Sequence, residues 1–164
     1  MAGERKAERR IEEPVRIDAP AERVHAVMGR PEEAPKWLPG CTRVERLGEE
    51  PPRFREWRRF AGHEASAVIT VRRHGAEAGG ALVHEAEAND GCNRVVYRYE
   101  VRPVGADACD VSCVGWAEPL NLLGRLTAGL MMRMCAKADA GALARLRDAI
   151  AAGTVGGGAT EASA

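Results

Sequence analysis

The sequence has few aromatic residues and no excess of either charge. Only 4% of its residues are Phe, Trp or Tyr, and 24 basic side chains balance 24 acidic ones. This balance argues against a protein that holds nucleic acid by bulk charge. No Ser-His-Asp spacing, glycine-rich phosphate loop or paired-carboxylate motif stands out, so the common signatures of hydrolases and nucleotide-binding proteins are missing.

Cysteine pairs and long apolar runs are also missing. The five cysteines are odd in number and include no Cys-x-x-Cys pair, so we expect free thiols in a reducing cytoplasm. The most apolar stretch, 120–135, contains Arg125 and Arg133 and is shorter than the roughly 18 to 20 residues of a membrane span. The charged first ten residues have no apolar segment typical of a secretory signal. These features predict a cytoplasmic protein.

Length and composition predict one globular domain. The chain has 164 residues, of which 45% are hydrophobic and 29% charged. We place the domain at 11–152, after a charged N-terminal tail at 1–10. The remaining segment, 153–164, is rich in Gly and Ala and is expected to be disordered.

The periodicity of apolar residues predicts the order of the elements. A strand at 11–18 precedes Asp18-Ala19-Pro20 and a short amphipathic helix, which must end by Gly29. A second helical turn is expected between Pro31 and Trp37. Alternating patterns then predict strands at 42–47, 54–60, 64–73, 81–88, 94–102 and 108–118.

After Pro119 the helical period returns and continues to Ile150, which predicts one long helix. Its expected sheet-facing stripe consists of Leu123, Leu130, Met131, Met134, Ala138, Ala142, Leu146 and Ile150. Because parallel strands need crossover helices, the meander must be antiparallel. Only the long helix can cover its apolar face. The fold class is therefore α+β of the helix-grip type, with about six to seven strands curved around the C-terminal helix.

With these elements in place, the chain resembles the superfamily that joins START-type lipid-transfer domains with polyketide cyclases and dehydratases, known as the SRPBCC or Bet v 1-like superfamily. The segment Ile17-Asp18-Ala19-Pro20-Ala21-Glu22-Arg23-Val24, followed by Pro31-Glu32, Trp37 and Pro39-Gly40, is similar to its first strand and paired short helices. The resemblance extends through the Val114 and Trp116 strand into the final helix. It implies an internal cavity for an apolar ligand, and it does not choose between carriers and enzymes.

Three residues are the candidate catalytic group. Alternation turns His84 inward on a strand whose other face is acidic, and it turns Tyr97 and Tyr99 toward the core. A partly desolvated imidazole can titrate near neutrality. Placed opposite the tyrosines, it could move a proton to or from an enolisable carbonyl. The alternative is a hydrogen-bonded core histidine beside a passive cavity.

The other candidates would contact a ligand. Trp37 could form a lid or pack between the short helices and the sheet. An arginine among Arg53, Arg55, Arg58 and Arg59 could hold a carboxylate or phenolate if it turned inward, and otherwise these arginines form a solvated strand face. The pattern does not decide which face of the 54–60 strand is inside, and a bulge near Gly115 could reconcile the two faces of 108–118. The expected ligand-binding residues are Trp37, Trp57, His63, Trp116, Leu130, Met131 and Met134.

We expect His25 and His74 to be solvated. His63-Glu64 has no second histidine at helical spacing, so we expect no bound metal, and no cofactor is indicated.

The leading hypothesis is a polyketide cyclase/dehydratase-like protein of secondary metabolism, such as antibiotic biosynthesis. Its partner would be an apolar, oxygenated small molecule or polyketide intermediate, without nucleic acid or an integral membrane. One alternative is a non-catalytic carrier or sensor for a lipid, quinone or pigment. Another is a protein-interaction module of the same fold. No pattern indicates an oligomeric state.

Overall fold

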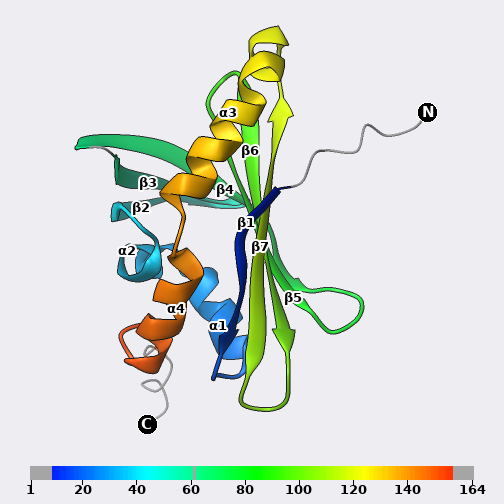
Figure 1. Ribbon diagram of the computed structural model, residues 1–164. Helices are drawn as coiled ribbons and strands as arrows, with labels where there is room; N and C mark the ends of the chain where they lie inside the picture. Colours follow the sequence, from blue (N-terminus) through cyan, green and yellow to red (C-terminus); the bar gives the residue numbers. More distant parts are fainter. Residues whose placement is uncertain (1–8, 61, 157–164) are drawn as a thin grey trace.

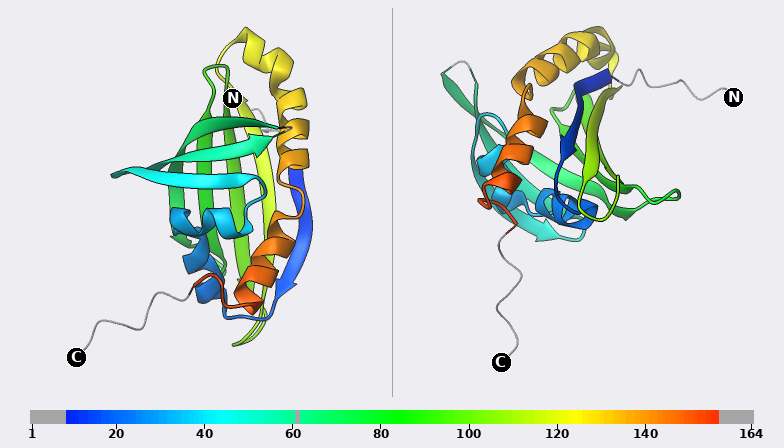
Figure 2. Two further views of the ribbon diagram at one scale, coloured as in Figure 1. Left: turned by 90° about the vertical axis from the view of Figure 1, so that its left-hand side faces the viewer. Right: turned by 60° about the horizontal axis from the view of Figure 1, so that its bottom comes forward.

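Seven strands form one antiparallel sheet in the order β1-β7-β6-β5-β4-β3-β2. The structure is a computed structural model that describes residues 9–60 and 62–156. The strands are β1 Arg9–Ile17, β2 Cys41–Glu49, β3 Pro52–Phe60, β4 His63–Ala76, β5 Leu82–Asn89, β6 Asn93–Pro103 and β7 Cys109–Pro119. The sheet is strongly curved, so that β2 and β3 run across the direction of β6 and β7 (Figure 2). The expected helix-grip sheet is confirmed.

Short helices close one end of the curved sheet (Figure 1). They are α1 Ala21–Met28, the 3₁₀ turn η1 Pro31–Glu33 and α2 Ala34–Trp37. The apolar residues Val24, Val27 and Met28 recur at helical spacing, and all three are buried against the sheet side. Both short helices lie where the sequence predicts them.

The C-terminal helix is interrupted, which corrects the expectation of a single helix. It consists of α3 Leu122–Ala138 and α4 Ala142–Ala151. Between them Gly141 adopts a left-handed conformation with φ of 86°. The Glu12 carboxylate of β1 accepts hydrogen bonds from the backbone N–H groups of Gly141 and Leu143, the latter at 2.8 Å. The first strand therefore holds the beginning of α4.

The break also changes which face of the helix is covered. Ala142, Leu146 and Ile150 of α4 are buried as expected. In α3, by contrast, Leu123 and Leu130 are 56% and 62% exposed, so their expected sheet-facing position is wrong. A continuous stripe requires an uninterrupted helix, and the turn at 139–141 resets its phase.

Gly124 and Met132 are the buried residues of α3. A Cβ at Gly124 would lie 2.1 Å from the carbonyl oxygen of Cys92 in the β5–β6 turn. A glycine at this position thus lets the helix approach the sheet.

The outer face of the sheet is covered by ion pairs. Arg72 and Arg94 both reach Glu87 and Glu118, at distances between 2.9 and 3.4 Å. Trp116 lies on this face, opposite Val96 in the β6–β7 pairing, and its indole N–H donates to Glu118. That pairing has continuous register over the described residues 93–119, so the expected bulge near Gly115 is not found there. Of the two pairings of β7, the one with β1 is irregular.

The two glycines of α3 give a matched test of this packing. Gly124→Ala should destabilise the protein by about 1–3 kcal/mol, because the added methyl group meets backbone rather than a movable side chain. Gly129→Ala should instead stabilise it by up to about 1 kcal/mol, since alanine favours helix and a Cβ there has open space. Urea unfolding of both variants measures the difference. Equal effects would contradict the close approach of α3 to the β5–β6 turn.

Candidate functional site

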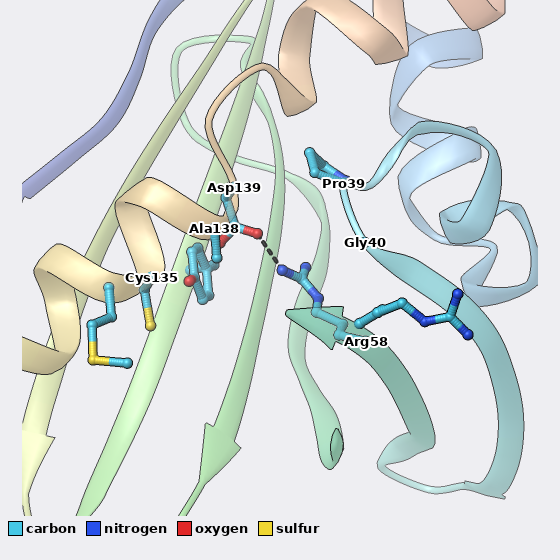
Figure 3. Close-up of a pocket in the computed structure, with 9 residues that line it drawn as sticks. Pro39, Gly40, Arg58, Cys135, Ala138 and Asp139 are labelled. Carbon is cyan, nitrogen blue, oxygen red and sulfur yellow. Dashed lines mark hydrogen bonds and ion pairs between the residues drawn. The ribbon is translucent and has the colours of Figure 1, made fainter. Parts of the chain in front are cut away.

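A pocket of about 290 Å³ lies between the C-terminal end of α3 and the inner face of the sheet. Figure 3 shows its walls, with Pro39 and Gly40 on one side and α3 on the other. The lining residues are Pro39, Gly40, Arg58, Arg59, Tyr97, Met134, Cys135, Ala138 and Asp139. The volume is near the lower end of the range of roughly 300–1,000 Å³ usual for small-molecule sites.

An arginine held by two carboxylates is the main polar feature of the pocket. Arg58 donates from Nε to Glu56 and from Nη1 to Asp139 (Figure 3 shows the second contact). Asp139 is only 2% exposed and Glu56 is also buried. Burial alone would lower the pKa of Arg58, but the two carboxylates outweigh it and raise the pKa above its ordinary value. A permanently protonated guanidinium, paired with two carboxylates, therefore lies at the pocket wall.

Alternation along β3 explains why Arg58 points inward. Phe54 and Glu56 are buried and Arg58 is half-buried, whereas Arg55 and Arg59 are exposed. Residues at intervals of two share one face of a strand, so the inner face of β3 carries an apolar residue, an acid and a base in succession. This result decides the orientation that the pattern left open.

Tyr97 reaches the same pocket from β6 and supplies a hydroxyl group. Burial, then the nearby Asp139 carboxylate and Cys135 thiol, raise the pKa of Tyr97 well above its ordinary value. The phenol is therefore protonated at all physiological pH values. It can donate a hydrogen bond to a ligand oxygen and cannot serve as a base.

His84 and Tyr99 lie on the inner face of the sheet, as alternation predicts, but outside the set of residues that line this pocket. The two are cross-strand partners with ring centroids 6.3 Å apart. Both are buried. Burial, followed by the neighbouring histidines, lowers the pKa of His84 to about 3. Its imidazole is therefore neutral at pH 7, rather than titrating near neutrality as the sequence suggested.

Three histidines from separate elements form a stacked cluster. His74 of β4 stacks on His25 of α1 with ring centroids 3.8 Å apart, and its Nδ1 lies 3.1 Å from Nδ1 of His84. His25 Nε2 in turn lies 2.9 Å from the carbonyl oxygen of Val83. The expectation that His25 is solvated is wrong, because α1 presses it onto the sheet. Over 9–60 and 62–156, no cluster of His, Cys, Asp or Glu has the arrangement of a metal site.

Comparison with known proteins identifies the family. Residues 8–151 match the family model described as polyketide cyclase / dehydrase and lipid transport. The chain belongs to this family. No functionally curated protein matches it.

Solved structures of this superfamily have the same fold at low identity. The di-domain aromatase/cyclase BexL from the BE-7585A biosynthetic pathway superposes with a TM-score of 0.67 and 18% identity over 92% of this chain. The match covers 47% of the BexL chain, so this protein spans about half of that di-domain.

Two further structures cover more of their own chains. The Zhui aromatase/cyclase from Streptomyces sp. R1128 has a TM-score of 0.61 and 14% identity, over 87% of this chain and 96% of its own. A STAR-related lipid transfer protein from Xanthomonas axonopodis has a TM-score of 0.59 and 18% identity, over 84% and 83%. At these identities the likeness shows the fold alone.

The structure brings only some of the expected ligand-binding residues together. Met134 lines the pocket, and Met131 is half-buried on the same helix. Trp37 is buried and meets Tyr99 edge-on at 6.1 Å, and it is not among the residues that line the pocket. Leu130 is exposed on α3.

Three of the expected contacts lie away from this pocket. Trp57 is on the outer face of β3, beneath the Arg43 guanidinium at 3.8 Å, because its parity is opposite to that of Arg58. His63 is exposed at the first residue of β4. Trp116 lies on the outer face of β7.

Sequence reasoning missed Asp139 and Glu56. Asp139 is the only acidic residue between Leu120 and Arg147, within a segment that carries several basic residues. Its isolation among basic residues was a signal of an internal partner, since a buried acid must be paired. Glu56 lies two residues after Phe54 and therefore on the same face of β3. Once that face was known to be the inner one, Glu56 could have been predicted to point inward.

The histidine cluster predicts that stability falls in mild acid. The folded pKa of His84 is about 3 and that of His74 about 4, both lowered first by burial from an ordinary value of 6.5. The unfolded chain therefore binds protons below about pH 6.5 while the folded chain does not. Stability is complete above that pH and decreases toward pH 4. His84 alone should contribute a loss of about 2 kcal/mol between pH 7 and pH 5.

Urea unfolding at pH 7.5, 6 and 5 measures this loss. His84→Gln removes the titrating group and should flatten most of the pH dependence, whatever its effect on stability at pH 7.5. His63→Gln, a change at an exposed histidine, should retain the wild-type slope. An unchanged slope in His84→Gln would show that other groups are responsible.

Proposed function

We propose that the pocket binds an apolar small molecule through its apolar walls and one oxygen function, and that it promotes polyketide cyclase/dehydratase-like proton-transfer chemistry. The observation that carries this proposal is the Arg58 guanidinium, held by Glu56 and Asp139 at the wall of a pocket also lined by Met134 and Ala138. A fixed charge beside an apolar wall suits a ligand with one oxygenated edge. Family membership supports the same class of ligand.

The arrangement suggests how the chain would assist such a reaction. The Asp139 carboxylate lines the pocket and would accept the proton from a methylene group next to a ketone, while negative charge develops on the ketone oxygen. Arg58 would stabilise that charge, and it has Nη2 available because its described hydrogen bonds use Nε and Nη1. Tyr97 would donate a hydrogen bond to the same oxygen or to a neighbouring one. No metal or redox cofactor is needed for this step.

In this proposal His84 and Tyr99 support the pocket and do not line it. A pKa of about 3 makes the His84 imidazole a weak base at neutral pH, and its Nδ1 faces His74. The Tyr99 ring meets the Trp37 ring edge-on and the His84 ring at a tilt. We therefore assign these residues to the positioning of β6, which carries Tyr97.

Binding of a hydroxylated aromatic probe tests the role of Arg58. We expect 1,8-dihydroxyanthraquinone to bind to the wild type, measured by quenching of tryptophan fluorescence. Arg58→Lys keeps the charge but loses the planar fork that holds both carboxylates, so the affinity should fall by about tenfold or more. Tyr97→Phe should weaken binding less, by the loss of one neutral hydrogen bond.

The matched control is Arg55→Lys, the same substitution on the outer face of β3. It should bind the probe as the wild type does. Circular dichroism and thermal unfolding show whether Arg58→Lys is folded. Equal affinities of the two lysine variants, both folded, would remove Arg58 from the site.

A non-catalytic carrier is the second candidate, favoured by the apolar residues that continue from the pocket along the exposed side of α3. Met134 lines the pocket and is itself 52% exposed, and Leu130 lies one helical turn away. A carrier would prefer oleate to the hydroxylated aromatic and would tolerate Arg58→Lys. Native mass spectrometry of the freshly purified protein, with identification of any bound molecule, separates the two candidates.

A further inference from the structure

Helix α3 exposes an unusual amount of apolar surface. Leu122, Leu123, Leu126, Leu130 and Met134 are 72%, 56%, 77%, 62% and 52% exposed. We call these five residues the α3 stripe. At 3.6 residues per turn they occupy one arc of the helix, opposite the buried Gly124 and Met132. Soluble domains seldom leave so many large apolar side chains together in water.

Nothing in the described fold covers this arc. Figure 2 shows α3 along an edge of the molecule, with no strand or other helix on its far side. Its contacts are with β7, β1 and β6, which lie beneath its buried face. The α3 stripe is therefore available to a partner outside the domain.

The charge of the helix indicates what kind of partner this is. From Leu122 to Ala138 the helix has three basic residues, Arg125, Arg133 and Lys137, and no acidic one. None of the three forms an ion pair with any residue that the structure describes. Arg133 and Lys137 fall within the same arc as the leucines.

Acidic groups in the segments around α3 have other partners. Asp139 pairs with Arg58, and Glu118 pairs with Arg72 and Arg94. Asp90 in the β5–β6 turn accepts hydrogen bonds from the backbone N–H groups of Cys92 and Asn93. The positive charge of α3 thus has no internal counterpart within 9–60 and 62–156.

We propose that the α3 stripe docks the protein onto an anionic lipid bilayer. The leucines would enter the interfacial region, and Arg133 and Lys137 would reach the phosphate groups with their aliphatic stems along the apolar surface. No described helix is long and apolar enough to cross a membrane, so α3 would lie on the surface. Anionic headgroups supply the negative charge that the helix lacks.

A second copy of the chain is a poorer occupant of the α3 stripe. In a twofold dimer the same patch faces itself, so Arg133 and Lys137 would be opposed by their own copies. This would bring like charges together in an apolar interface. A bilayer satisfies both the leucines and the cations.

The inference goes beyond the proposed function and does not depend on it. The pocket could bind a hydroxylated aromatic whether or not α3 contacts lipid. If both hold, the mouth beside Met134 opens next to the bilayer, where apolar molecules are concentrated.

Co-sedimentation with vesicles tests the proposal. The wild type should bind vesicles of equal parts phosphatidylglycerol and phosphatidylcholine at least about tenfold more strongly than vesicles of phosphatidylcholine alone. Raising the salt concentration should weaken this binding. Leu122→Gln/Leu126→Gln should reduce it by about tenfold or more. Arg133→Gln/Lys137→Gln should abolish the preference for anionic vesicles.

The control is Leu47→Gln/Val104→Gln, which changes two exposed apolar residues on β2 and in the β6–β7 turn. It should bind vesicles as the wild type does. Circular dichroism and thermal unfolding of every variant show that the fold is intact. The proposal is overturned if the wild type does not bind anionic vesicles, or binds both compositions equally. It is also overturned if the leucine variant loses only self-association, measured by native mass spectrometry, which would identify a second copy as the occupant.

Discussion

The ion pair between Arg58 and Asp139 is the contact on which the rest of the structure depends. It joins β3 to the turn between α3 and α4, two segments that are 81 residues apart in the chain. A carboxylate that is 2% exposed requires a compensating charge, since an unpaired buried charge costs several kcal/mol. The pair therefore determines where the C-terminal helix breaks relative to the sheet.

The position of the pocket follows from that contact. Its walls are the residues just before the break and the strand that carries Arg58. Burial, and after it Asp139, raise the pKa of Tyr97, so the carboxylate that holds the guanidinium also disfavours ionisation of the phenol. Buried ion pairs add little net stability compared with apolar packing, but they select one arrangement among several. Here the selected arrangement is a charged group at the wall of an apolar pocket.

At the other end of the sheet, packing replaces charge. His25 and His84 are buried, and the His74 ring stacks on His25 and meets His84 edge-on. Burial lowers the pKa values of His74 and His84, so these two imidazoles are neutral at pH 7 and contact one another without any counterion. The two ends of the domain thus accommodate polar groups differently. At one end His74 and His84 are neutral, and at the other Arg58 is paired with Glu56 and Asp139.

Much of this fold could be predicted because alternation is a local property. The two faces of β6 follow from Val95 to Val101 alone, and they place Tyr97 and Tyr99 correctly. The Arg58 site could not be predicted in the same way. The four arginines of β3 differ only in whether their sequence position is odd or even. That difference identifies the inward arginine only when the side of the strand that faces α3 is known. The expectation for His25 was wrong for a related reason, because a helix of only eight residues does not show how far its buried face extends, and His25 lies within that face beside Ala21 and Met28.

The error over α3 has a physical explanation. Leu122 and Leu126 lie on one side of this helix, and Gly124 and Met132 on the other, so a helical period in apolar residues fits either side. Size would favour the leucines as the buried face, yet the close approach to Cys92 requires the glycine side to face the sheet. A single sheet can cover only one side of a helix. Because α3 is apolar on both sides, one apolar side stays uncovered by the sheet. The basic residues of α3 lie beside that uncovered side without internal partners among the described residues. Apolar side chains combined with unneutralised positive charge suit an interface at which hydrocarbon and anionic groups occur together.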